Sequence, residues 1–124
     1  MHRGQKKLLN YLFILFLYLT FIPNAFSKPL IIAHRGASGE APENTMVAFK
    51  LAWELGADGI EGDFHLTRDG HIVAIHDKDT NKVTKGKNKL IVKKTSLKEL
   101  QGLDVGSWKN EKYSKARIPT LGCY

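Results

Sequence analysis

The order of apolar runs and polar clusters in the first two thirds of the chain constrains its fold more than any other feature. Residues 30–33 and 72–75 are short apolar runs typical of buried strands, and each leads directly into a histidine, His34 or His76. Residues 45–55 lie between them and place apolar side chains four positions apart, as one face of a helix requires. This strand–helix–strand order predicts an α/β fold.

The expected helix carries signals at both of its ends. Asn44 or Thr45 can cap its first turn, because a short polar side chain accepts hydrogen bonds from the free main-chain N–H groups there. Gly56 follows Leu55 and suits the left-handed backbone that often closes a helix. We therefore expect the helix to end at Leu55.

A second strand is expected over residues 57–66, followed by a tight-turn signal at residues 68–70 and a third strand at 72–75. Only a few residues separate these two strands, whereas a parallel crossover needs about a dozen or more. Two alternatives follow: a β/α barrel in which one unit lacks its helix, or a plain hairpin.

The second half of the chain has weaker signals. Residues 78–94 are polar and rich in lysine and are expected to form a loop, with a short edge strand at 90–92. Ser96 and Glu99 have the spacing of a capping box, which predicts a helix of one or two turns. Residues 118–121 have the character of an approach to another strand.

The first part of the chain is predicted to be a targeting segment. A positively charged start precedes an almost wholly apolar run at residues 8–22, and small residues precede a cleavage point after Ser27. The run is about 15 residues long, whereas a spanning helix needs about 20, so we expect a cleaved signal peptide at 1–27; the alternative is a retained anchor. Both alternatives export the domain of residues 28–124, which would be periplasmic or secreted.

Composition limits the partners and the size of this domain. The chain has a formal net charge of +7, but residues 1–27 carry three basic residues and no acidic ones, so residues 28–124 carry +4. Their charge is weak evidence for a nucleic-acid partner, and none is expected. These 97 residues can bury one small core, whereas a complete β/α barrel has roughly 250 residues. Cys123 is the only cysteine, so no intramolecular disulfide can form.

Glu61 and Asp63 lie two positions apart in the expected second strand. Side chains alternate between the two faces of a strand, so both carboxylates are expected on the same face. Two carboxylates suit a hard divalent cation such as Ca²⁺ or Mg²⁺. The alternative is a pair of solvent-facing acids on an amphipathic strand. His65 lies near the turn and is expected to be a surface residue.

His34 and His76 are candidates for acid–base chemistry, because imidazole exchanges protons near neutral pH. One can take a proton from a nucleophile while the other gives a proton to a leaving oxygen. The alternative for each is a hydrogen-bonded structural histidine, but two of them at the ends of separate strands favour a site. Asp77 can orient His76 or cap a loop.

Arg35 follows His34 directly, and its planar guanidinium can hold two phosphate oxygens. The alternative for Arg35 is a surface ion pair with Glu40 or Glu43. Gly36 permits a sharp backbone turn or a close approach to a ligand.

Other residues have simple structural explanations. The segment of residues 43–45 is explained by a helix start. The lysines between residues 78 and 94 are expected to lie on a solvated loop, and their functional alternative is the attraction of anionic substrates or lipid head groups. Trp53 and Trp108 are expected to be packing residues.

Taken together, these clusters resemble the N-terminal signature of the glycerophosphodiester phosphodiesterase family. The resemblance follows the family's order and spacing over five segments, residues 32–36 (IAHRG), 42–45 (PENT), 60–63 (IEGD), 66–70 (LTRDG) and 75–77 (IHD). Each segment alone is a weak signal, whereas the ordered set is specific. The resemblance covers roughly residues 29–121.

This resemblance implies the N-terminal portion of a TIM-type β/α barrel, truncated before the later βα units, with its site at the carboxyl ends of the strands. It also implies hydrolysis of small-molecule glycerophosphodiesters to sn-glycerol 3-phosphate and an alcohol. By position, His34 and His76 would be the acid and base, and Arg35 would hold the phosphate. Glu61 and Asp63 would bind the divalent metal, Ca²⁺ or Mg²⁺. Membrane contact is expected only through an uncleaved N-terminal segment.

The sequence departs from the family pattern in three ways, one of which is that the family's later strands, with their phosphate- and head-group-binding residues, are missing from this sequence. Gly62 stands where the family has an apolar residue between the carboxylates. After Leu121 the family has another metal-binding glutamate, whereas this chain has residues 122–124. We therefore expect a frameshift, an early stop or a fragment boundary there. Two alternatives to a working phosphodiesterase are a non-catalytic remnant and a related phospholipase D-type lipid hydrolase.

Overall fold

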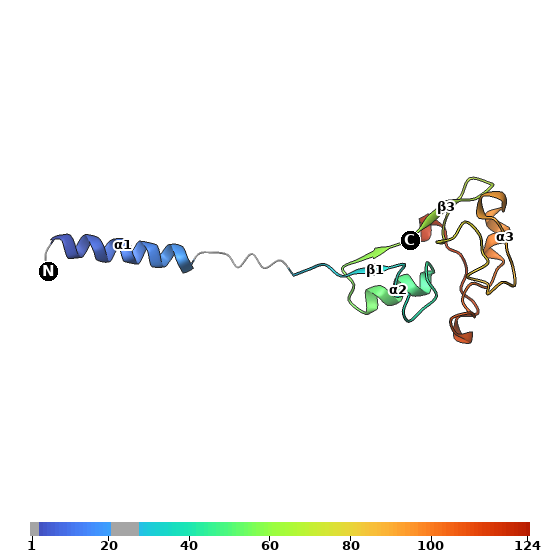
Figure 1. Cartoon of the computed structure of the whole chain (residues 1–124), viewed down its shortest axis with the longest axis horizontal. Coiled ribbons are helices and arrows are strands. Elements are labelled where there is room, and N and C mark those ends of the chain that lie inside the picture. The colour runs from blue at the N-terminus through green and yellow to red at the C-terminus, as the bar shows by residue number, and fades with distance from the viewer. Residues whose placement is uncertain (1–2, 21–27) are drawn as a thin grey trace.

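The computed structural model describes residues 3–20 and 28–124. In the first range, α1 (Arg3–Thr20) is a helix that lies apart from the rest of the described chain (Figure 1). The helices in these two ranges fall short of the length and apolar character that a membrane crossing requires. The predicted cleavage point after Ser27 lies outside the described residues, so the signal peptide stays a prediction.

A strand–helix–strand unit forms the first part of the folded region. β1 (Ile32–His34) and β2 (Gly59–Glu61) pair in parallel, and α2 (Met46–Glu54) connects them (Figure 1). The register places Ile32 opposite Gly59 and His34 opposite Glu61. A Cβ at Gly59 would lie 2.8 Å from Cδ1 of Ile32, so the absence of a side chain allows this close pairing.

The predicted ends of α2 are confirmed. The Thr45 hydroxyl accepts a hydrogen bond from the Ala48 N–H and caps the first turn. Leu55 closes the helix, and Gly56 follows in the left-handed region with φ of 83°. The helix is short and is anchored by its inner side, where Ala48, Phe49 and others are buried.

β3 (Phe64–Leu66) and β4 (Ile72–Ala74) pair as an antiparallel hairpin. Of the two alternatives left open by the sequence for these strands, the hairpin is therefore the one observed. The prediction of one continuous strand over residues 57–66 is wrong. β2 ends at Glu61, and Gly62 and Asp63 form a break between it and β3. The break has a physical cause, because the main chain of Asp63 bonds outside any strand pair: its N–H donates to a side-chain oxygen and its carbonyl accepts from the N–H that follows β4.

The remaining residues contain little regular structure. α3 (Leu97–Gln101) begins with the predicted capping box, in which Ser96 and Glu99 bond each other's main-chain N–H groups. The prediction of a strand at residues 90–92 is wrong, because a 3-10 helix, η1 (Val92–Lys94), begins at Val92. A single bridge between Asp79 and Ile91 is all the pairing recorded there.

Two further 3-10 helices follow, η2 (Glu111–Tyr113) and η3 (Leu121–Cys123). The prediction that residues 118–121 lead into another strand is wrong, because η3 begins at Leu121 and Thr120 pairs with Val73 of β4 only through a single antiparallel bridge. This segment therefore covers β4 without forming a full strand.

The main hydrophobic core lies in the second part of the folded region. Seven buried side chains pack together, Val73, Ile75, Val83, Val92, Leu100, Val105 and Ile118. Trp108 packs against this cluster as predicted, and its indole N–H donates to the Val105 carbonyl at 2.8 Å. Residues with little regular structure are thus held together by burial of apolar side chains.

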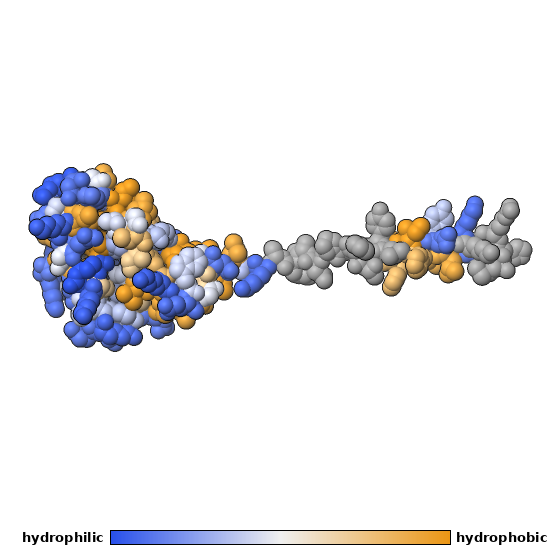
Figure 2. All heavy atoms as spheres, turned by 180° about the vertical axis from the view of Figure 1, so that it is seen from behind, coloured by the Kyte–Doolittle hydropathy of each residue, from blue (hydrophilic) through white to orange (hydrophobic). Residues whose placement is uncertain are grey.

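The strand–helix–strand unit is more exposed than predicted. Residues 30–33 are not a buried strand, because Leu30 and Ile32 expose 74% and 54% of their surface. Trp53 on α2 exposes 54%, so its predicted packing role is wrong. In the described chain β1 and β2 pair only with each other, so no further strand lies along either outer edge of this small sheet. Hydrophobic residues reach the surface on the face shown in Figure 2.

Candidate functional site

The ends of β1 and β2 bring two predicted site residues together. His34 closes β1 and Glu61 closes β2, and their parallel register sets them opposite each other. Nε2 of His34 lies 3.9 Å from Oε2 of Glu61, a distance that allows an ion pair when the imidazole is protonated. The two side chains are 68% and 43% exposed, so both are open to a ligand.

Arg35 and Gly36 form the turn that follows β1. Both have positive φ, 59° and 76°, a region that residues other than glycine seldom adopt. The Arg35 N–H donates to Oε2 of Glu61 at 3.1 Å, which offsets part of this strain. A Cβ at Gly36 would lie 2.6 Å from the carbonyl carbon of Ala48. The turn therefore packs directly onto α2 and fixes where the Arg35 side chain starts.

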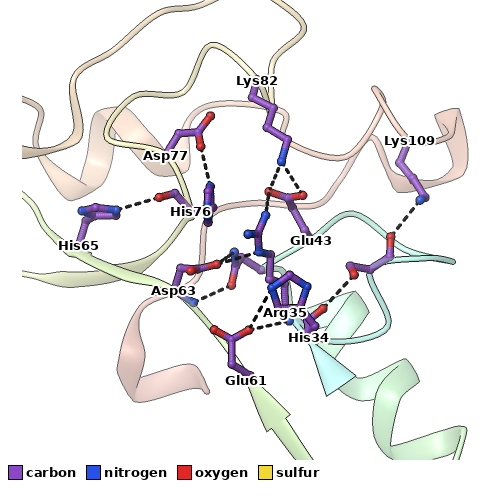
Figure 3. Close-up of polar contacts among 12 residues, drawn as sticks. His34, Arg35, Glu43, Glu61, Asp63, His65, His76, Asp77, Lys82 and Lys109 are labelled. Atoms are coloured by element: carbon purple, nitrogen blue, oxygen red, sulfur yellow. Dashed lines mark hydrogen bonds and ion pairs between the residues drawn. The ribbon is translucent and has the colours of Figure 1, made fainter. Parts of the chain in front are cut away.

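The Arg35 side chain lies at the centre of an ion cluster (Figure 3). Its Nη1 donates to Oε1 of Glu43 at 3.3 Å, and its Nε lies 3.0 Å from Oδ2 of Asp63. The second contact is close but not aligned, so the buried Nε–H has no hydrogen-bond acceptor among residues 3–20 and 28–124. The three side chains are only 15%, 11% and 26% exposed. The pair with Glu43 thus exists, but it is shielded from water and not on the open surface.

Glu61 and Asp63 reach the same arginine through different groups of it. Glu61 accepts from the main-chain N–H of Arg35, whereas Asp63 faces its guanidinium. Their predicted position on one face of a continuous strand is wrong, because β2 ends at Glu61. Both carboxylates nevertheless lie beside Arg35, one at the end of β2 and the other at the strand break.

Asn44 holds Asp63 against the start of α2. Its Nδ2 donates to Oδ2 of Asp63 at 3.0 Å, and its Oδ1 accepts from the Asp63 N–H at 3.1 Å. The residue is 3% exposed, has φ of 55°, and its own N–H donates to the Arg35 carbonyl. Sequence reasoning assigned Asn44 only to a helix start and missed this contact. The available signal was its residue type, since asparagine tolerates positive φ and carries both a donor and an acceptor.

His76 reaches the cluster from the other side. The Ile75 N–H donates to the Asp63 carbonyl at 2.9 Å, which brings the end of β4 to the strand break at Asp63. Nδ1 of His76 lies 2.6 Å from Oδ1 of Asp77, so Asp77 orients the ring as expected. His76 and Glu43 both line a small cavity of about 10 Å³, the volume of one water molecule at most.

Two residues that were predicted to lie on the surface, Lys82 and His65, contact residues of the candidate site. Lys82, expected on a solvated loop, donates to both carboxylate oxygens of Glu43 at 2.9 Å. His65 is half-buried, and its Nε2–H can donate to the His76 carbonyl at 3.0 Å. Neither contact has a signal in the spacing of the sequence, because each depends on how the loop folds back.

The cluster carries an excess of negative charge. Three carboxylates, those of Glu43, Glu61 and Asp63, face two cations, Arg35 and Lys82. The contacts of Glu61 and Asp63 each use one carboxylate oxygen, so the other lies outside these contacts. Oxygens of this kind are the ligands that Ca²⁺ and Mg²⁺ prefer. Over residues 3–20 and 28–124, however, no three Asp, Glu, His or Cys side chains group closely enough to hold a metal.

Tyr124 covers the strand beside this cluster. Its hydroxyl donates to the Ile60 carbonyl at 2.5 Å, and its ring meets those of Phe49 and Phe64 edge to face. Burial raises the pKa of the Tyr124 phenol, and the negative charge of Glu61 raises it further. The phenol therefore stays protonated and keeps donating at neutral pH.

Comparison with known proteins places these features in a family. Residues 34–122 match the model of the Glycerophosphoryl diester phosphodiesterase family. A glycerophosphodiester phosphodiesterase of Caldanaerobacter subterraneus subsp. tengcongensis is 53% identical over 94 residues, which are 76% of this chain and 38% of that relative. One from Bacillus subtilis is 40% identical over 90 residues, 73% of this chain and 30% of the relative. The chain thus spans less than two fifths of the length of these relatives.

Solved structures agree with this match. A phosphodiesterase of Oleispira antarctica, in complex with the product sn-glycerol-3-phosphate, has a TM-score of 0.71 and 44% identity, over 75% of this chain and 37% of that one. A glycerophosphodiester phosphodiesterase of Agrobacterium tumefaciens has a TM-score of 0.71 and 36% identity, over 76% and 40%. The structural relatives are β/α barrels, so the predicted α/β class and its relation to the TIM-type barrel are confirmed.

Proposed function

Because this chain belongs to the glycerophosphoryl diester phosphodiesterase family, we propose that it serves the hydrolysis of glycerophosphodiesters to sn-glycerol 3-phosphate and an alcohol. The observation that carries the proposal is the pairing of His34 and Glu61 at adjacent strand ends, beside the Arg35 cluster. The product named for the Oleispira antarctica relative supports the substrate class. This chain spans only part of the length of its relatives, and we propose that it has the activity itself.

The two histidines supply the proton transfers. Breaking a phosphodiester P–O bond requires a base that takes a proton from the attacking oxygen and an acid that protonates the leaving one. His34 and His76 take these two roles, and both are partly exposed. Asp77 orients His76, because its Oδ1 lies 2.6 Å from Nδ1 of the imidazole ring.

Arg35 holds the phosphate. The contacts of its guanidinium involve Nε and Nη1, which leaves Nη2 to meet an oxygen of the diester. Glu43, Asp63 and Asn44 keep the arginine in place before substrate arrives, so little ordering is needed on binding.

Glu61 and Asp63 would hold a divalent cation, Ca²⁺ or Mg²⁺, through the carboxylate oxygens outside their protein contacts. The excess of negative charge around Arg35 supports this proposal, because an anionic diester would otherwise be repelled. When bound, such a cation supplies positive charge that offsets the charge of the diester as its bond breaks.

The test is an assay of glycerophosphocholine hydrolysis in which ³¹P NMR follows sn-glycerol 3-phosphate. His34→Ala is expected to lower the rate by about 10²–10⁴-fold, the usual contribution of one acid–base group, and EDTA is expected to abolish activity. His71→Ala is the matched control, because His71 is an exposed histidine on the hairpin, away from the cluster. Equal rates in the two variants would remove His34 from the mechanism.

Export through the N-terminal segment is part of the same proposal. A positive start followed by an apolar run is typical of a secretory signal, and the product would then form outside the cytoplasm. Sequencing the N-terminus of the protein recovered from outside the cytoplasm tests this directly, and a start at Lys28 is expected.

A further inference from the structure

A groove runs along the side of the β3–β4 hairpin, next to the candidate site but separate from the Arg35 cluster. It has a volume of about 460 Å³ and is lined by His65, Leu66, Lys78, Asp79, Ile91, Val92 and Lys93. The proposed reaction uses none of these side chains. Its position is set by the hairpin, since His65 in the groove bonds the carbonyl of His76.

The floor of the groove is apolar and open to solvent. Leu66 at the end of β3 is 58% exposed, and Ile91 before η1 is 40% exposed. The neighbouring Val92 is buried in the core at 1% exposure, so the segment that carries Ile91 is firmly anchored. Two large apolar side chains are therefore held at the surface by a rigid support.

The rim of the groove is positively charged. Lys78 and Lys93 are both exposed, and neither has an ion-pair partner within the two described ranges. The one acid of the groove, Asp79, lies 3.9 Å from Nζ of Lys89, which offsets its charge. The lysines of this loop differ in their partners. Lys82 forms an ion pair with Glu43, whereas Lys78 and Lys93 on the rim stay free to bind an external anion.

We propose that this groove docks the protein onto a bilayer that contains anionic phospholipids. Leu66 and Ile91 would enter the boundary between head groups and acyl chains, while Lys78 and Lys93 would meet the lipid phosphates. The occupant follows from charge complementarity: an apolar floor inside a rim of unpaired lysines fits an anionic amphiphile and suits neither a cation nor a neutral sugar. This surface is independent of α1 and of any catalytic activity.

The experiment measures binding of the full chain to vesicles by co-sedimentation. Vesicles of phosphatidylcholine with about a third phosphatidylglycerol are compared with pure phosphatidylcholine at low and high salt. The double variant Lys78→Gln/Lys93→Gln is expected to bind the anionic vesicles about 25-fold more weakly, at about fivefold per lysine. All variants keep residues 1–27, so any binding through α1 is common to them.

Two controls make the result specific. Lys85→Gln/Lys87→Gln removes the same charge from two exposed lysines of the same loop outside the groove, and it is expected to bind as the unchanged chain does. Leu66→Gln/Ile91→Gln is expected to weaken binding, whereas Leu30→Gln/Leu55→Gln, which changes two exposed leucines outside the hairpin, is not. Circular dichroism checks that each variant is folded.

Three outcomes would overturn the proposal. One is equal loss of binding in the two lysine variants, which would show a general charge effect of the loop. Another is unchanged binding in Lys78→Gln/Lys93→Gln. The third is competition by millimolar sn-glycerol 3-phosphate, which would show that a soluble phosphate and not the bilayer is the occupant.

Discussion

The two parts of the folded region, residues 28–63 and 64–121, differ in how far they bury their apolar side chains. In residues 64–121, seven apolar side chains from separate segments close around one another, although the backbone there has little regular structure. In residues 28–63 the structure is regular, yet Leu30, Leu55 and others stay at the surface. Parallel strands are normally buried on both faces, so a single β–α–β unit has more apolar surface than it can cover itself.

The site lies where these two parts meet. His34, Arg35 and Glu43 come from the first part, whereas His76 and Lys82 come from the second. The bonds of Glu43 to both Arg35 and Lys82 tie the parts together (Figure 3). The polar cluster is therefore expected to contribute to the stability of the first part as well as to chemistry.

The largest effect is expected at the turn of the first part. Gly36→Ala would place a Cβ 2.6 Å from the Ala48 main chain at a backbone with φ of 76°, so we expect a loss of roughly 3–5 kcal/mol in unfolding free energy. Denaturant unfolding measures it. Gly39→Ala is the control, because no atom lies within 4 Å of its Cβ position. Similar stability in both variants would contradict the close packing of this turn.

A pair of leucines tests the comparison between the two parts. Leu100→Ala removes a fully buried side chain of the core and is expected to cost about 2–5 kcal/mol. Leu55→Ala removes a side chain that is 66% exposed and is expected to change stability by about 0.5 kcal/mol or less. Thermal unfolding of both variants decides the question, and a large loss for Leu55→Ala would mean that the first part has a core of its own.

The strand break at Asp63, between the two parts, has its own test. Asn44→Gly keeps a residue that tolerates φ of 55° but removes both side-chain bonds to Asp63, so a loss of about 1–3 kcal/mol is expected. Hydrogen exchange at the Asp63 amide should quicken, since its acceptor is gone. Unchanged protection at that amide would rule out Asn44 as the group that holds Asp63 in place.

The smallest effect concerns acid. A hydrogen bond from Thr67 lowers the pKa of Asp69, with a further contribution from the Leu97 N–H. A carboxylate whose pKa is lower in the folded state adds stability above its ordinary pKa near 4 and loses it as the pH falls through the folded value. We therefore expect the unfolding midpoint to fall less between pH 6 and pH 3 in Asp69→Asn than in the unchanged chain. A steeper fall in the variant would contradict this sign.

The elements that depend on local chemistry were predictable from the sequence. Thr45 and Ser96 cap their helices as their spacing indicated, because a cap needs only a neighbouring N–H. The strand break at Asp63 was not predictable, because it depends on Asn44, which lies 19 positions away in the chain. The prediction that residues 30–33 are buried was also wrong, because an apolar run indicates a preference for strand structure but not how many neighbours will cover that strand.

The site shows the same division. His34, Arg35, Glu61, Asp63 and His76 could be selected from residue type and position. Their partners could not be selected, because the bond between Lys82 and Glu43 spans 39 positions and requires the loop to fold back. Spacing therefore indicates which groups are candidates for the chemistry, whereas the contacts that position them come from the three-dimensional structure.

The most direct test of the site is binding of sn-glycerol 3-phosphate, followed by ³¹P NMR titration. If the Arg35 cluster holds the phosphate, the unchanged chain shows a saturable shift and Arg35→Gln binds about 10–100-fold more weakly, as expected for loss of a charged hydrogen bond. Arg68→Gln removes an arginine that pairs with Glu99 away from the cluster, and it should bind as the unchanged chain does. Equal affinity in the two variants would contradict a phosphate site at Arg35.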